Sequence, residues 1–97
     1  MDKNNLLKLA IHLYGKDAQM LMAIEEMSEL TKAICKVFRM GENDTPEVRE
    51  HVREEIADCK IMIAQMEIIF GSADGWENRK LQRLEDRMNA HINREQP

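Results

Sequence analysis

The glycine and proline residues of this chain fall at a few positions that divide it into segments of helical length. The four glycines and two prolines are Gly15, Gly41, Pro46, Gly71, Gly75 and Pro97. Between these positions, apolar residues recur at the i, i+3, i+4 spacing of a helix that buries one face. The pattern predicts helices over about residues 3–13, 17–40, 46–70 and 76–93. We therefore expect an all-α, four-helix fold in a single domain over residues 1–97.

The clearest of these boundaries is the sequence GENDTP at residues 41–46. Gly41 suits the position just after a helix, because glycine adopts unusual backbone angles there at low cost. Thr45 suits an N-cap, where its hydroxyl can accept from a free backbone amide, and Pro46 suits the first helical position. We expect a new helix to begin at Pro46.

Charge, cysteine spacing and hydropathy exclude several classes of function. With 18 acidic and 14 basic residues the net charge is -4, which provides no basic footprint for a nucleic acid polymer. Cys35 and Cys59 lack the ligand spacing of a structural zinc site, and we expect both to be buried and reduced. No signal-peptide core occurs, and no apolar segment approaches the roughly 20 residues that span a bilayer. We expect no membrane association and a cytoplasmic location.

Two of the predicted helices carry the same arrangement of acidic residues. The sequences AIEEMSEL at 23–30 and VREEIADC at 52–59 each contain two adjacent acids and a third acid three residues later. Residues at i and i+3 lie on one helix face, about 5–6 Å apart at Cβ. Glu26 can therefore converge with Glu29, and Glu55 with Asp58, so that each pair shares a cation.

Glu55 lies within the most apolar stripe of its helix. Its neighbours within about 60° on a helical wheel are Val48, Val52, Cys59, Met62 and Met66. An ionised carboxylate there is costly unless it has a cation, a hydrogen-bond network or a raised pKa. Four carboxylates suit a hard cation, Mg²⁺ where phosphates complete the coordination, with Mn²⁺ as a substitute. The alternative is an ordinary acidic helix surface, since glutamate is a good helix former.

With these acids the chain resembles the MazG-like family of all-α nucleoside triphosphate pyrophosphohydrolases. The family hallmark is ExxE followed by ExxD, and the matching residues here are Glu26, Glu29, Glu55 and Asp58. The flanking sequences EEMSEL at 25–30 and REEIAD at 53–58 are also similar, as is KLQRLEDR at 80–87. The resemblance implies a bundle completed by oligomerisation, Mg²⁺ dependence, and hydrolysis of a nucleoside triphosphate or dNTP to the monophosphate and pyrophosphate. In that reaction the four acids bind metal and act in catalysis, and Glu26 or Glu29 orients the attacking water.

Basic residues of the last predicted helix are candidates for phosphate binding. Lys80, Arg83 and Arg87 follow i, i+3, i+7 spacing and so form one basic stripe suited to the β- and γ-phosphates. The alternative is ion pairing with nearby acids such as Glu77 or Glu85. Lys32, one turn after Glu29, is a further candidate.

Aromatic and histidine side chains provide weaker signals. Tyr14 and Trp76 are candidates for stacking on the nucleobase, although each also suits a core or loop-anchoring position. His51, one turn before Glu55, is a candidate to assist the site, or an incidental surface histidine.

The predicted helix at 46–70 is apolar on two sides. Opposite Glu55 it carries a second apolar line, Ala57, Ile61, Ala64 and Ile68. A helix that is apolar on two sides must bury both, and a chain of 97 residues has little with which to cover them. We expect a homodimer or homotetramer.

Two other functions fit parts of this pattern. A non-catalytic helical protein-interaction module would use the acids to pair with a basic partner and the second apolar face for docking. A related phosphoribosyl-ATP, dUTP or dCTP hydrolase would share the same acids. Metal dependence of stability separates the first from a hydrolase, and substrate screening separates the hydrolases.

Overall fold

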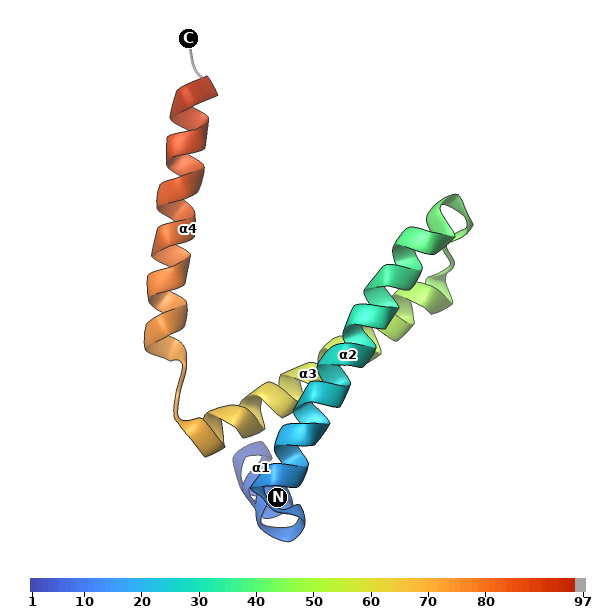
Figure 1. Cartoon of the computed structure of the whole chain (residues 1–97), viewed down its shortest axis with the longest axis vertical. Coiled ribbons are helices and arrows are strands. Elements are labelled where there is room, and N and C mark those ends of the chain that lie inside the picture. The colour runs from blue at the N-terminus through green and yellow to red at the C-terminus, as the bar shows by residue number, and fades with distance from the viewer. Residues whose placement is uncertain (96–97) are drawn as a thin grey trace.

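The computed structural model describes residues 1–95, and these are almost entirely helical. Helix α1 (Lys3–Tyr14) leads to α2 (Lys16–Met40), a 3-10 turn η1 (Gly41–Asn43), α3 (Pro46–Phe70) and α4 (Asp74–Glu95), as Figure 1 shows. No strand occurs in this part of the chain, so the all-α prediction is confirmed. None of its helices is long and apolar enough to cross a membrane.

The predicted boundary at residues 41–46 is confirmed in detail. Helix α2 ends at Met40, and Gly41 follows it as the cap, with a φ of 53°, a backbone conformation that favours glycine. The hydroxyl of Thr45 accepts a hydrogen bond from the Val48 amide at 3.3 Å, and Pro46 opens α3. The chain therefore reverses here by local capping.

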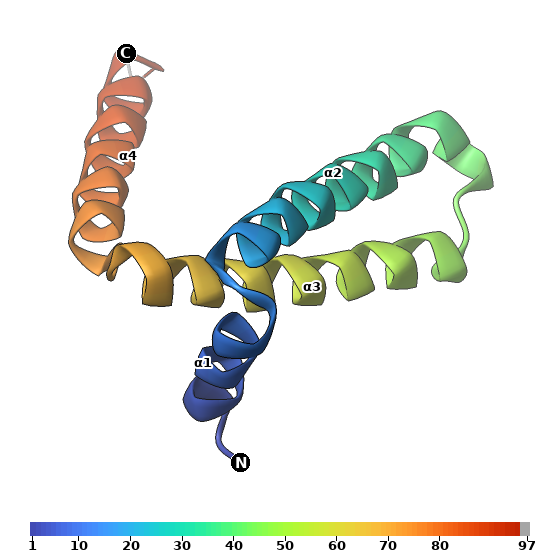
Figure 2. The ribbon, with the colours of Figure 1, turned by 60° about the horizontal axis from the view of Figure 1, so that its bottom comes forward.

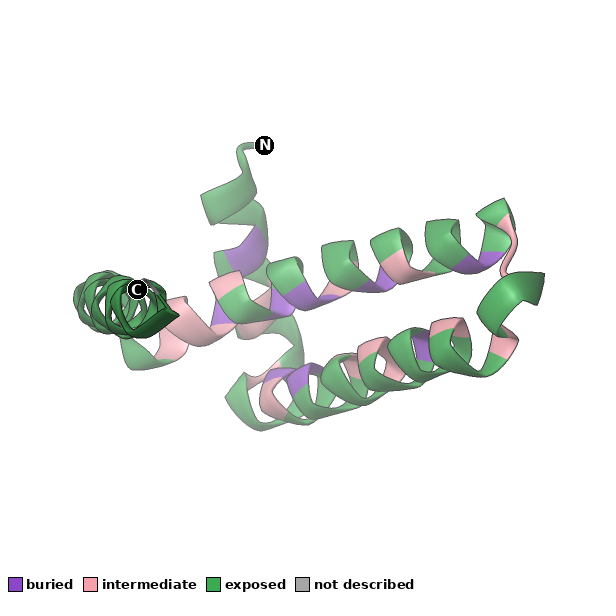
Figure 3. Cartoon of the chain, turned by 90° about the horizontal axis from the view of Figure 1, so that it is seen from above, coloured by how far each residue is buried: buried purple, intermediate pink, exposed green. Residues whose placement is uncertain are grey.

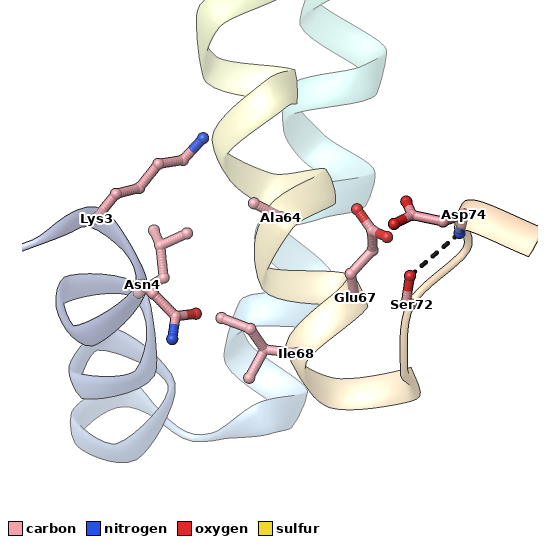
Figure 4. A pocket seen from close by; sticks show the side chains of 8 residues that line it. Lys3, Asn4, Ala64, Glu67, Ile68, Ser72 and Asp74 are labelled. Carbon is pink, nitrogen blue, oxygen red and sulfur yellow. Dashed lines mark hydrogen bonds between the residues drawn. The ribbon is translucent and has the colours of Figure 1, made fainter. Parts of the chain in front are cut away.

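Helix α4 begins at Asp74, two residues earlier than the predicted start at 76. The Ser72 hydroxyl accepts from the Asp74 amide at 3.2 Å, and the Glu67 carboxylate accepts from the Ala73 amide at 2.9 Å. These acceptors satisfy backbone amides at the helix start, so Gly75 is taken into the helix. Figure 4 places Glu67, Ser72 and Asp74 together at this connection, beside a hollow of about 430 Å³ next to α1.

Helices α2 and α3 form an antiparallel hairpin, and α1 packs across one end of it (Figure 2). The core is the seam between the facing sides of α2 and α3, where Figure 3 shows the buried segments. The buried apolar residues are few and mostly small: Leu7 of α1, and Ala23, Ala33, Val48, Cys59 and Met62 of α2 and α3. Three polar residues, Gln19, Glu55 and Gln65, are buried with them. The prediction that both cysteines are buried is wrong for Cys35, which is exposed because it lies on the side of α2 opposite Glu26.

Helix α4 extends away from the other three helices and packs against none of them (Figures 1 and 2). None of its described residues is buried. Its apolar residues nevertheless form one stripe, Leu81, Leu84, Met88 and Ile92, and each of these is 50–55% exposed. On α3, Ile61 of the second apolar line is also 44% exposed. The apolar stripe of α4 and part of the second apolar line of α3 are therefore not buried by the rest of the same chain.

Candidate metal centre

Three of the four predicted acids meet across the α2–α3 seam. Glu26 lies on α2, and Glu55 and Asp58 lie one turn apart on α3. One carboxylate oxygen of each residue lies within 4.8 Å of the other two. Both helices extend well beyond these positions in each direction, so the three side chains are placed by regular backbone and not by loops.

A hydrogen bond from Cys59 links α3 to α2 beside the three acids. Its thiol donates a hydrogen bond to the backbone carbonyl oxygen of Glu26, with 3.3 Å between sulfur and oxygen. Cys59 and Ala23, both small, are buried on α3 and α2. Asp58 is the residue next to Cys59, and one of its carboxylate oxygens lies within 4.8 Å of one of Glu26.

Glu55 is the most buried of the three acids. It is only 7% exposed, and its Oε2 is buried without a hydrogen-bond partner. Its Oε1 lies 3.7 Å from His51 Nε2, too far for a strong hydrogen bond. A buried carboxylate without a partner is costly, and one that converges with two further carboxylates is suited to hold a divalent cation. The residues present therefore fit a metal.

Burial and neighbouring carboxylates raise the pKa of two groups at this centre, Glu26 and Cys59. Partial burial first, and then the negative charges of Asp58 and Glu55, raise the pKa of Glu26 above its ordinary value of 4.5. Burial, and then the charges of Glu26 and Glu55, raise the pKa of Cys59 above 9.0. Cys59 is therefore a neutral thiol at neutral pH, which suits its role as a hydrogen-bond donor.

We expect the metal-free protein to lose stability as the pH rises from 4.5 toward neutrality. Because the pKa of Glu26 is raised in the folded state, the native protein holds this proton more tightly than the unfolded chain. The free energy of unfolding then falls as Glu26 ionises through its raised pKa. Denaturant unfolding in EDTA should show this fall for the wild type and a smaller fall for Glu26→Gln. Glu25→Gln, which changes the neighbouring exposed acid, is the matched control and should retain most of the wild-type slope, because burial, Asp58 and Glu55 each raise the pKa of Glu26 more than Glu25 does; equal slopes for all three proteins would contradict the prediction.

The fourth predicted acid, Glu29, is outside this group. Its Oε1 lies 3.3 Å from Lys32 Nζ, and the Lys32 side chain is 70% exposed and that of Glu29 43%. A surface pair of this kind contributes only about 0.2–1 kcal/mol, so it holds Glu29 weakly. The structure thus brings Glu26, Glu55 and Asp58 together and leaves Glu29, which pairs with Lys32, outside that group.

The remaining predicted site residues are more distant. Lys80, Arg83 and Arg87 lie on α4, which does not contact α2 or α3 of the same chain. Trp76 is exposed, and the Arg79 guanidinium lies 5.1 Å from the centre of its ring. Tyr14 lines a hollow of about 460 Å³ with Ala18, Gln19 and Met22, on the stretch of α2 that precedes Glu26.

Two buried glutamines were not predicted from the sequence. Gln19 and Gln65 are 7% and 4% exposed, and Gln65 Oε1 has no hydrogen-bond partner. Gln19 is seven residues before Glu26, and Gln65 is seven residues after Asp58. Residues seven apart lie on nearly the same helix face. The seven-residue spacing was the sequence feature that could have predicted polar residues in the α2–α3 seam beyond the three carboxylates.

Comparison of the chain with models of protein families, with curated proteins and with solved structures gave no match.

Proposed function

We propose that this chain is a divalent-metal-dependent pyrophosphohydrolase of the MazG-like kind, which cleaves a nucleoside triphosphate or dNTP into the monophosphate and pyrophosphate. The observation that carries the proposal is the buried, unpartnered Oε2 of Glu55, which lies in a group with Glu26 and Asp58. In the described residues, no lysine or arginine forms an ion pair with these three acids. Such an arrangement costs stability, and it is expected where a site requires the charge.

The described side chains divide into two roles in this reaction. A divalent ion, when bound, would supply Lewis-acid chemistry and a more acidic attacking water. Glu26, Glu55 and Asp58 supply the oxygen ligands, which the two helices hold in place. Glu29, which only a surface ion pair with Lys32 holds, can turn to orient the water and accept its proton. Water attacks the α-phosphorus, the bond from that phosphorus to the bridging oxygen breaks, and pyrophosphate leaves.

We place the nucleobase in the hollow beside Tyr14. This hollow begins one turn of α2 before Glu26, at Met22, and continues to Tyr14 at the end of α1. The span suits the separation of a base from its phosphates, and Tyr14 offers an aromatic surface for stacking. Trp76 is a weaker candidate, because Arg79 lies over its ring.

We further propose that the bundle is completed by a second copy of the chain. Helix α4 has a half-exposed apolar stripe and no partner within its own chain. Burying such a stripe stabilises an assembly in proportion to the apolar area removed from water. Lys80, Arg83 and Arg87 flank the stripe, so an α4 that packs on a second copy can present them to that copy's acids and bound phosphates. A homodimer or homotetramer would both bury the apolar stripe of α4 and bring its basic residues to the acids of a second copy.

The proposed activity is tested by pyrophosphate release from a panel of nucleoside triphosphates. The panel should include canonical and modified NTPs and dNTPs, among them dUTP and dCTP, together with phosphoribosyl-ATP. We expect release with Mg²⁺ or Mn²⁺ and none with EDTA, and the ranking of substrates identifies the base and sugar. Folded, oligomeric protein that releases nothing from any substrate would contradict the proposal.

The exposed apolar areas on α3 and α4 equally favour the non-catalytic interaction module. Thermal melting separates the two functions. A metal centre binds the ion only when folded, so the melting temperature should rise with Mg²⁺ concentration and fall in EDTA. An interaction module that uses the acids for a protein partner should melt at the same temperature in both.

A further inference from the structure

Gln19 is a buried polar residue that lines the hollow beside Tyr14. The other residues that line this hollow of about 460 Å³ are Tyr14, Ala18 and Met22. Gln19 is only 7% exposed. Within residues 1–95, no hydrogen bond involves its side chain. The amide therefore has both a donor and an acceptor left for a molecule that enters the hollow.

A buried amide without a hydrogen-bond partner costs stability. The loss arises because the amide gives up its hydrogen bonds to water and gains none in the protein. Ala23 and Ala33 of the same helix show that this side of α2 is otherwise buried with small apolar residues. An apolar side chain would fill the position of Gln19 at less cost. The amide is therefore expected to serve a ligand that supplies the missing hydrogen bonds.

The buried amides of the α2–α3 seam lie on one side of the three acids. Gln19 on α2 and Gln65 on α3 are each seven residues from an acid of the metal centre, and the antiparallel helices place them in the same direction from it (Figure 2). Gln65 is 4% exposed, and its Oε1 has no partner. In the opposite direction the buried residues of the seam are apolar, Ala33 and Val48. In the described helices, the seam is thus polar only toward the hollow.

The distance along the helix suits a nucleotide. Seven residues of α-helix, from Glu26 back to Gln19, rise by about 10 Å. This is comparable with the length of a nucleotide from its α-phosphate to the far edge of its base. A nucleotide whose phosphates bind at the metal centre can therefore bring its base to Gln19. Glutamine recognises a base edge by accepting one hydrogen bond and donating another.

We propose that the Gln19 amide recognises the edge of the nucleobase, so that the substrate must carry a base with a hydrogen-bond donor beside an acceptor. This role rests on the proposed function and identifies a residue that determines its substrate. The amide oxygen accepts from a ring N–H or an amino group, and the amide nitrogen donates to the neighbouring oxygen or ring nitrogen. A triphosphate without a base binds only through its phosphates and sugar.

The test uses the full-length protein, the best nucleotide of the substrate panel, and ribose 5-triphosphate, which has no base, as a competitor. Gln19→Met removes both hydrogen-bonding groups and keeps a side chain of similar length. It should lower kcat/KM for the nucleotide by about 10-fold or more, and change the inhibition constant of ribose 5-triphosphate by less than about 2-fold. Gln65→Met makes the same change at a buried glutamine outside the residues that line the hollow, and both constants should stay within about 2-fold of wild type. Circular dichroism should show that both variants are folded.

The outcomes separate this role of Gln19 from the proposed hydrolase. An unchanged kcat/KM in Gln19→Met would overturn the role of the amide and leave the hydrolase standing. Equal losses in Gln19→Met and Gln65→Met, or an equal weakening of ribose 5-triphosphate, would also overturn it, because the effect would then come from the packing of the seam. Folded wild type that cleaves no nucleotide of the panel would remove the proposed function, and this role with it.

Discussion

Glu55→Gln should reduce metal-dependent pyrophosphate release by at least about 100-fold, because it removes the most buried oxygen donor of the centre. The same substitution should leave the metal-free protein as stable as the wild type or more stable. It replaces a buried carboxylate whose Oε2 has no partner with a neutral side chain of the same shape. The melting temperature of the variant should also cease to depend on Mg²⁺. Loss of function and unchanged or increased stability would together distinguish a functional residue from a structural one.

The matched control is Glu54→Gln, which makes the same chemical change at the neighbouring, exposed acid. We expect it to retain activity within about 2-fold and to keep the stabilisation by Mg²⁺, because a surface charge contributes little. If both variants lose activity equally, the effect would come from the general charge of α3 and not from a ligand at Glu55. If Glu55→Gln retains full activity, the centre proposed here would not be the active site.

Helix limits were predictable from local chemistry. Thr45 and Pro46 cap α3 as expected, because an N-cap hydroxyl and a leading proline satisfy the same backbone requirement in almost any tertiary context. The start of α4 was less predictable, since Gly75 indicated a loop. The amide acceptors of Ser72 and Glu67 decide that boundary, and glycine is tolerated in the first turn.

The candidate site was predictable in its helical spacing and less so in its side-chain contacts. Periodicity placed Glu55 in an apolar stripe, and the structure confirms that it is buried. Glu29 has the same spacing from Glu26 as Asp58 has from Glu55, yet it bonds to Lys32 on its own helix. That choice depends on rotamers and competing partners of similar energy, which a helical wheel does not contain. Hydrophobic periodicity also indicates that the apolar stripe of α4 must be buried. It does not identify the surface that buries it.

Two inactive variants of this chain should restore activity to each other if α4 of one copy serves the carboxylates of another. Glu55→Gln removes a metal ligand, and the double substitution Arg83→Ala with Arg87→Ala removes the basic stripe of α4. Each variant alone should be inactive or severely impaired. In a mixed dimer, one of the two sites combines the intact acids of one chain with the intact α4 of the other. Random pairing in co-expressed dimers should therefore give about a quarter of wild-type pyrophosphate release.

The outcome depends on which chain supplies the basic residues. If α4 folds back onto its own acids, every site in the mixture carries one defect, and activity should stay at the level of the separate variants. Adding Leu84→Glu to both chains is the control, because a charge within the apolar stripe of α4 should prevent packing on a second copy. Restoration that disappears with Leu84→Glu would show that assembly completes the site. Asn93→Glu, which adds the same charge on the other side of α4, should leave the restoration intact, and sedimentation of each mixture would relate the recovered activity to the fraction of assembled chains.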